Sequence, residues 1–140
     1  MKEIVPVTRV DATIAVPGSK SLTQRALIAA ALADGRSRLL GPLTSEDTDY
    51  TSKALEQMGI SVHKEKDLWQ VEGNGGRIAT PTGEIYLGNN GTATRFLTSV
   101  AALGHGLFTI DGEERMRERP IGPLMEALKG KGRRPLTRVG

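Results

Sequence analysis

Residues 29–35 read Ala-Ala-Ala-Leu-Ala-Asp-Gly, and residues 100–106 read Val-Ala-Ala-Leu-Gly-His-Gly. Sliding the chain over itself by about 71 residues brings these two stretches together. The same shift lays Leu-Leu-Gly at 39–41 on Ile-Asp-Gly at 110–112, and Gly59 on Gly130. Three matches at one offset indicate an internal duplication. The fold must therefore be built from a repeated unit.

The first copy of this unit alternates strands and helices. β-Branched residues favour strands at 3–7 and 12–16, closed by a Pro-Gly pair. Apolar residues spaced on one helical stripe favour a helix capped by Ser19 and ended by Gly35. The remaining elements are expected at 38–40, 47–58, 60–64 and 68–71. The unit is thus β-α-β-α-β-β, and we expect an α/β (α+β) fold.

The second copy begins in the same order but stops early. A strand is expected at 84–87, a helix over 93–101, a strand at 107–110 and a helix starting near Pro120. From residue 130 onward the sequence has no alternation of apolar and polar residues. We therefore expect about two units, the second lacking its last two strands, and a divergent, poorly ordered tail at 131–140.

Composition places the chain among ordinary globular proteins. Its 140 residues are 38% hydrophobic and 25% charged, which suits one domain and argues against disorder. The absence of cysteine excludes disulfides and thiolate metal sites, and it fits a reducing, cytoplasmic compartment. No apolar run reaches the roughly 20 residues of a membrane span, so no membrane partner is expected.

The net charge of +3 comes from the carboxyl-terminal end. The last ten residues contain no acid and four bases: Lys131, Arg133, Arg134 and Arg138. The rest of the chain is near neutral, and no aromatic residues lie between these bases. A nucleic-acid partner is therefore the weakest of the functional hypotheses.

Two glycine-containing turns precede helices at equivalent positions of the two units. The first is Pro-Gly-Ser-Lys-Ser-Leu-Thr-Gln-Arg at 17–25, and the second is Leu-Gly-Asn-Asn-Gly-Thr-Ala-Thr-Arg at 87–95. A helix N-terminus carries unpaired N–H groups and partial positive charge, so each turn can cradle an anion. The alternative is a solvated, capped helix start. Two such turns at equivalent places favour a shared ligand cleft.

Other candidates have simpler interpretations. The mixed-charge run at 111–120 is of a kind that usually forms a solvated surface, with one or two arginines facing a ligand at most. His63 and His105 lack further metal ligands at suitable spacing. Trp69 is expected to pack in the core, and Asp47 is expected to cap a helix.

Three motifs, in order, resemble the 5-enolpyruvylshikimate-3-phosphate synthase family. They are Val-Pro-Gly-Ser-Lys-Ser-Leu-Thr-Gln-Arg-Ala-Leu at 16–27, Leu-Gly-Asn-Asn-Gly-Thr-Ala-Thr-Arg at 87–95 and Arg-Met-Arg-Glu-Arg-Pro-Ile-Gly-Pro-Leu at 115–124. The UDP-N-acetylglucosamine enolpyruvyl transferases are less similar, because their first motif differs. The resemblance implies two domains, each of three repeat units, that close on substrates between them.

The resemblance also implies a reaction, which belongs to the shikimate pathway of aromatic amino acid and chorismate biosynthesis. An enolpyruvyl group passes from phosphoenolpyruvate to the 5-hydroxyl of shikimate 3-phosphate, without metal or organic cofactor. Lys20 resembles a catalytic lysine that contacts both substrates. Ser21 and Arg25 resemble a pair that binds shikimate 3-phosphate, and Arg115 resembles an arginine that binds the phosphate of phosphoenolpyruvate. Three residues of the glycine turn resemble further contacts to phosphoenolpyruvate: Asn89, Gly91 and Thr92.

The chain also departs from the family pattern. Asn90 stands where a small residue is usual, and Phe96 where a proline is common. Family members are about three times as long. We therefore expect this chain to supply half of the substrate cleft, to be inactive alone and to need a carboxyl-terminal remainder as partner. The alternative is a non-catalytic anion-binding or regulatory remnant.

The family also suggests domain boundaries. Residues 1–12 would form a strand belonging with the second domain, and residues 13–130 would form a partial first domain. An open sheet edge and missing strands favour dimerisation or poor solubility, and the amino-terminal strand would lack its partner.

Overall fold

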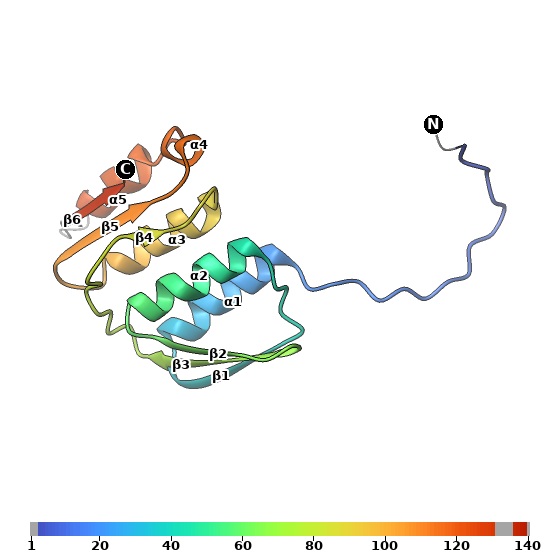
Figure 1. The fold of residues 1–140 in the computed structure, drawn as a ribbon, viewed down its shortest axis with the longest axis horizontal. Coiled ribbons are helices and arrows are strands. Elements are labelled where there is room, and N and C mark those ends of the chain that lie inside the picture. The colour runs from blue at the N-terminus through green and yellow to red at the C-terminus, as the bar shows by residue number, and fades with distance from the viewer. Residues whose placement is uncertain (1–2, 131–135, 140) are drawn as a thin grey trace.

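A computed structural model describes residues 3–130 and 136–139 (Figure 1). The helices are α1 (Lys20–Leu32), α2 (Glu46–Gln57), α3 (Gly91–Ala101), α4 (Glu114–Arg117) and α5 (Gly122–Gly130). The strands are β1 (Asp34–Leu40), β2 (Ser61–Lys64), β3 (Leu68–Asn74), β4 (Ile85–Tyr86), β5 (Leu107–Asp111) and β6 (Leu136–Val139).

The strands form two small sheets with helices between them. The first sheet has the order β1-β3-β2 and is antiparallel, with Leu39 opposite Trp69. The second has the order β4-β5-β6 and is parallel, with Ile85 opposite Ile110. Helices α1 and α2 cover one face of the first sheet, and α3 contacts both of these helices as well as β5 (Figure 1).

The internal duplication is confirmed by the helix starts. α1 begins at Lys20 and α3 at Gly91, the separation that the sequence repeat requires. Their N-caps are also equivalent, since Ser19 accepts a hydrogen bond from the Leu22 N–H and Asn90 accepts one from the Ala93 N–H. The α/β class predicted from the sequence is thus observed in repeated units.

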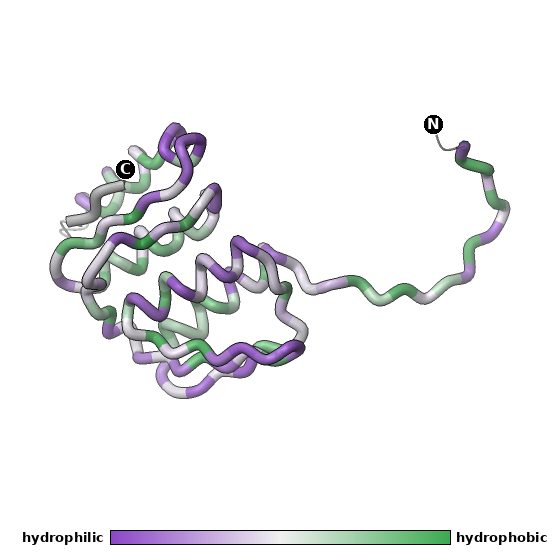
Figure 2. The backbone as a smooth tube through the Cα atoms, in the orientation of Figure 1, coloured by the Kyte–Doolittle hydropathy of each residue, from purple (hydrophilic) through white to green (hydrophobic). Residues whose placement is uncertain are grey.

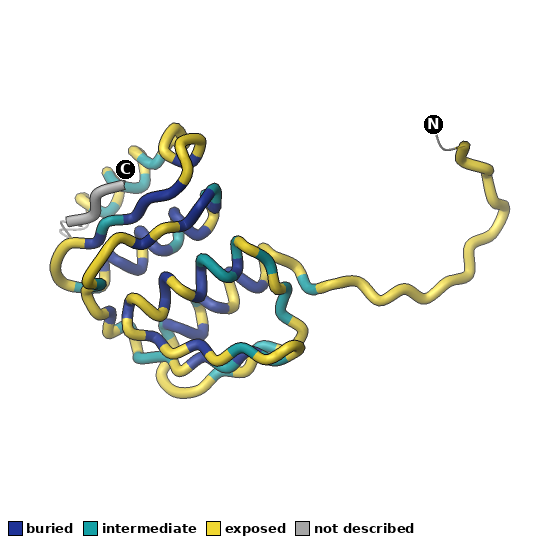
Figure 3. Tube along the Cα trace, viewed as in Figure 1, coloured by how far each residue is buried: buried dark blue, intermediate teal, exposed yellow. Residues whose placement is uncertain are grey.

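One hydrophobic core serves both units. Leu27, Leu55 and Trp69 of the first unit and Leu97 and Phe108 of the second are at most 2% exposed and belong to a single cluster. Figure 2 shows hydrophobic residues on the inward side of the helices, and Figure 3 shows the same positions buried. The shared core fixes α3 against α1 and α2, and therefore fixes the two glycine turns relative to each other.

The strands expected at 3–7 and 12–16 are not formed. The described part of the segment before α1 is an exposed arm that leaves the globular body (Figures 1 and 3). A strand needs a sheet edge for its backbone groups, and no other described segment pairs with this arm. The assignment of residues 1–12 to another domain stays a prediction.

Two further expectations are corrected. The second helix begins at Glu46 with Ser45 as its cap, in a reciprocal box with Thr48, so Asp47 is a first-turn residue rather than the cap. The tail contains a strand, β6, which pairs with β5 although its sequence does not alternate. The expected disorder of residues 131–135 and 140 concerns positions outside the described residues.

A pair of leucine substitutions tests the shared core. Leu55 is fully buried and Leu107 is 58% exposed. Leu55→Ala should lower the free energy of unfolding by about 2–5 kcal/mol, because it leaves a cavity. Leu107→Ala should change it by less than about 1 kcal/mol. Urea denaturation followed by circular dichroism measures both, and equal losses would contradict this account of the core.

Candidate anion-binding site

The N-terminus of α3 is held by a glycine turn and a buried amide. Gly88 has a φ of +56°, and a Cβ at this position would lie 2.6 Å from Cε2 of Tyr50. Only glycine fits both constraints. Asn90, 3% exposed, caps the helix through its Oδ1, and its Nδ2 donates to the Asp47 carbonyl at 2.9 Å. The start of α3 is therefore tied to the start of α2.

A cavity of about 370 Å³ opens beside this helix start. Its lining contains three arginines, two residues of the first turn of α3 and one aromatic ring: Arg25, Arg95, Arg119, Gly91, Thr92 and Phe96. No acidic side chain belongs to this lining. The cavity therefore concentrates positive charge next to the positive end of a helix dipole.

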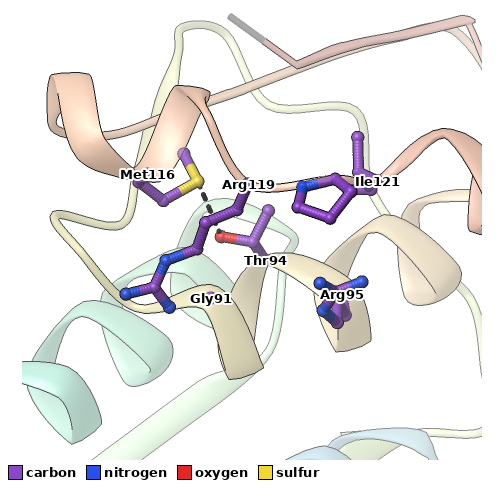
Figure 4. Close-up of a pocket in the computed structure, with 7 residues that line it drawn as sticks. Gly91, Thr94, Arg95, Met116, Arg119 and Ile121 are labelled. Carbon is purple, nitrogen blue, oxygen red and sulfur yellow. Dashed lines mark hydrogen bonds between the residues drawn. The ribbon is translucent and has the colours of Figure 1, made fainter.

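Arg119 lies directly across Gly91. A Cβ at position 91 would come within 2.5 Å of Nη1 of Arg119, so glycine is what allows the guanidinium to reach the helix start. Figure 4 shows Arg119 extending over Gly91, with Arg95 on the same helix; together with Met116 and Ile121 these residues line a second, smaller pocket that shares Gly91, Arg95 and Arg119 with the cavity. The buried Thr94 hydroxyl donates to the Met116 sulfur at 3.5 Å, which helps to hold α4 against α3.

Arg25 reaches the cavity from α1. Its Nη1 donates to the Ser21 hydroxyl at 2.7 Å and to the Ser21 carbonyl at 2.9 Å, and its guanidinium lies 5.5 Å from the centroid of Phe96. These contacts fix the side chain but leave its charge without a counter-ion. Within residues 3–130, no carboxylate forms an ion pair with any of the three cavity arginines. Such a site favours an anion with several negative charges.

Only some of the residues that the sequence proposed for the site line the cavity. Arg25, Gly91 and Thr92 line the cavity, and Ser21 orients Arg25. The other candidates do not belong to the lining: Lys20, Asn89 and Arg115. Their assigned roles stay predictions.

Each residue outside the lining has a distinct environment. Lys20 makes a 2.6 Å ion pair with Asp47 at the start of α2. Asn89 precedes the cap of α3, and its Oδ1 is buried without a hydrogen-bond partner among the described residues. Arg115 is exposed on α4. A buried acceptor without a donor is uncommon in native proteins.

Sequence reasoning missed two arginines of this cavity. Arg95 lies one helical turn after Gly91, and that spacing is the signal that could have placed it on the same face. Arg119 comes from the mixed-charge run, where spacing gave no way to choose among three arginines. The short helix α4 determines which arginine reaches the cavity. It ends at Arg117, and the chain after it brings Arg119 back against Gly91 of α3.

The loop that carries Arg119 is anchored by an ion pair. Arg117 donates from Nε to Oδ1 of Asp111 at 2.8 Å and from Nη2 to Oδ2 at 2.6 Å. These hydrogen bonds, with one from the Gly112 N–H, hold the pKa of Asp111 below its ordinary value of 3.8. The carboxylate thus fastens α4 to the end of β5.

Two features of the described residues bear on other functions. In residues 3–130 and 136–139, no three or more His, Cys, Asp or Glu side chains gather where they could hold a metal ion. No helix of this part of the chain has the length and apolar character needed to cross a bilayer.

Comparison with known proteins gives consistent matches. The sequence model of the family described as EPSP synthase (3-phosphoshikimate 1-carboxyvinyltransferase) matches residues 4–134. A 3-phosphoshikimate 1-carboxyvinyltransferase from Rhizobium leguminosarum is 53% identical over 83% of this chain, and one from Nostoc sp. is 48% identical over 88%. The structure of an EPSP synthase from Acinetobacter baumannii superimposes with a TM-score of 0.79 at 28% identity over 85% of this chain.

Fold and site together define an α/β repeat protein with an arginine-lined cavity at a helix N-terminus. The chain belongs to the EPSP synthase (3-phosphoshikimate 1-carboxyvinyltransferase) family. It spans 28% of the Rhizobium relative, 29% of the Nostoc relative and 27% of the Acinetobacter chain.

The Asp111–Arg117 pair predicts a pH-dependent contribution to stability. Because the folded-state pKa of Asp111 is lowered, its contribution is present above the unfolded-state pKa and is lost as pH falls through the folded-state value. Asp111→Asn should therefore lower the free energy of unfolding at pH about 7, and the difference from the parent chain should shrink below pH about 4.

Urea titrations at a series of pH values from about 7 down to about 3 measure the difference. Asp67→Asn is the matched control, since Asp67 is exposed and its carboxylate forms no ion pair within the described chain. A destabilisation by Asp111→Asn that stayed constant to pH about 3 would show that the ionised carboxylate is not its cause.

Proposed function

We propose that this chain supplies half of the cleft in which an enolpyruvyl group passes from phosphoenolpyruvate to shikimate 3-phosphate. The observation that carries the proposal is the set of three arginines without counter-ions around the N-terminus of α3. Both proposed substrates are polyanions, and the relatives are named for this transfer. A cluster of fixed cations and backbone N–H groups suits ligands of that kind.

The geometry supports particular roles within this cleft. We assign the phosphate of phosphoenolpyruvate to Arg119 and the first turn of α3, because Arg119 lines the cavity and Arg115 does not. We assign shikimate 3-phosphate to Arg25, and the hydrogen bond that holds its guanidinium to Ser21 supports this assignment. Lys20 is the proposed catalytic cation, and its ion pair with Asp47 holds it near the helix starts until substrates compete for it.

The proposed half-cleft explains why turnover should need more chain. No carboxylate or imidazole belongs to the lining of this cavity, so the groups that move protons must come from elsewhere. The cavity is also open, whereas charge stabilisation is strongest in a closed site that excludes water. A remainder corresponding to the uncovered part of the relatives is the proposed partner.

The same lack of a proton-transfer group favours a second candidate function. A chain that keeps the cations without an acid or base can bind polyanions and not transform them. On this view the protein is a non-catalytic anion-binding or regulatory remnant of the family. The two functions differ in whether the addition of a remainder produces turnover.

Phosphate release from phosphoenolpyruvate plus shikimate 3-phosphate tests the main proposal. We expect none from the 140-residue chain alone and measurable release after addition of a separately expressed carboxyl-terminal remainder of a relative. Turnover by the chain alone would overturn the half-cleft proposal. Binding of phosphoenolpyruvate without turnover in either mixture would favour the non-catalytic function.

A matched pair of arginine variants tests the site. In the complemented mixture, Arg119→Ala should lower kcat/KM by about 100-fold or more, because it removes a charge at the proposed phosphate position. Arg115→Ala removes the same charge from an exposed site outside the cavity and should change kcat/KM by less than about 3-fold. The reverse order of effects would return the phosphate contact to Arg115.

A further inference from the structure

Phe96 is a large apolar residue of α3 that the hydrophobic core does not account for. The core residues of this helix are at most 3% exposed: Ala93, Leu97, Val100 and Ala101. Phe96 is only half-buried. Within the described residues it belongs neither to the core cluster nor to the partly buried residues packed against that cluster. Its ring lies instead in the lining of the arginine cavity.

The ring of Phe96 contacts a cation from the other repeat unit. The guanidinium of Arg25 lies over this ring, with its Cζ 5.5 Å from the ring centroid. A cation within about 6 Å of an aromatic face is attracted by the negative face of the ring. Because Arg25 comes from α1 and Phe96 from α3, the contact joins the two units at the cavity.

The contact with Phe96 adds a restraint that Ser21 does not give. Ser21 lies one turn before Arg25 on the same helix, so its two hydrogen bonds fix the guanidinium relative to α1 only. The ring fixes the guanidinium relative to α3, whose first turn lines the same cavity at Gly91 and Thr92. The spacing between the Arg25 charge and the start of α3 is therefore set before a ligand binds.

Such a restraint favours ligand binding. The Arg25 residue is exposed, and a long exposed side chain loses rotamer freedom when a ligand orders it, which lowers affinity. A contact that orders the side chain in advance removes part of this cost.

An aromatic ring is also a suitable partner for an arginine that binds an anion. Lys20 provides the contrast, since it is paired at 2.6 Å with the Asp47 carboxylate, and an anionic ligand must compete with that carboxylate. A ring face attracts the guanidinium without cancelling its charge. Phe96 can therefore hold Arg25 in place and leave it fully cationic.

We infer that Phe96 is a positioning residue, whose ring holds Arg25 in place for the anionic ligand of the cavity. It acts through Arg25, so it sets the affinity for the ligand of Arg25 and leaves the rate of the chemical step nearly unchanged. The identity of that ligand as shikimate 3-phosphate rests on the proposed function, whereas the contact between the arginine and the ring does not.

Nuclear magnetic resonance of the 140-residue chain tests the contact itself. The ring current of Phe96 should shift the Hε and Cδ protons of Arg25, and Phe96→Leu should remove this shift while Phe96→Tyr keeps it. Tyr86→Leu removes an exposed ring outside the cavity lining and should leave the shift in place. Arg25 resonances that are the same in the parent chain and in Phe96→Leu would overturn the inference.

Titration with shikimate 3-phosphate tests the effect on affinity. Phe96→Leu should raise the Kd by about 3–10-fold, and Phe96→Tyr should stay within about 2-fold of the parent chain. In an Arg25→Ala background, Phe96→Leu should add less than about 2-fold, because its effect passes through Arg25.

The titration separates failure of this inference from failure of the proposed function. A parent chain that binds no shikimate 3-phosphate would overturn the ligand assignment and this inference with it. Equal affinities of the parent chain and Phe96→Leu would overturn the role of Phe96 alone.

Kinetics of the complemented mixture distinguish positioning from a role in the chemistry. Phe96→Leu should raise the KM for shikimate 3-phosphate by about 3–10-fold and change kcat by less than about 2-fold. The KM for phosphoenolpyruvate should change by less than about 2-fold, since its phosphate is assigned to Arg119. A lower kcat with an unchanged KM for shikimate 3-phosphate would contradict positioning through Arg25.

Discussion

The buried amide of Asn90 is the contact through which the two repeat units meet at the site. Its oxygen caps α3, and its nitrogen donates to the Asp47 carbonyl in the first turn of α2. The carboxylate of the same Asp47 pairs with Lys20, the first residue of α1. Three helix N-termini therefore converge on neighbouring residues. The Asn90 side chain thus has a structural use at this position.

This convergence concentrates positive charge that the protein only partly neutralises. The Asp47 carboxylate forms an ion pair with Lys20. No carboxylate of the described chain forms an ion pair with Arg25, Arg95 or Arg119. Holding like charges together costs free energy unless an anion binds between them. The ion pair of Asp111 with Arg117 and the packing of Met116 on Thr94 keep the loop of Arg119 in place. The fold thus holds several arginines side by side at one helix start, where a bound anion would relieve their mutual repulsion.

The two repeat units differ in how their sheets are assembled. In the described chain β1 pairs only with β3, whereas in the second unit β4 pairs with β5. In the second sheet β6 lies directly beside β5, whereas in the first sheet β3 separates β2 from β1.

By itself the sequence determined the duplication, the helices and the glycine turns, because periodicity, caps and glycine positions act over a few residues. It also carried the family motifs. Tertiary structure alone decided three matters. Arg119 rather than Arg115 lines the cavity, since the path of a loop after a short helix depends on what packs beneath it. The arm forms no strand and the tail forms β6, because a strand exists only where an edge accepts its hydrogen bonds, and that edge lies far away in the sequence.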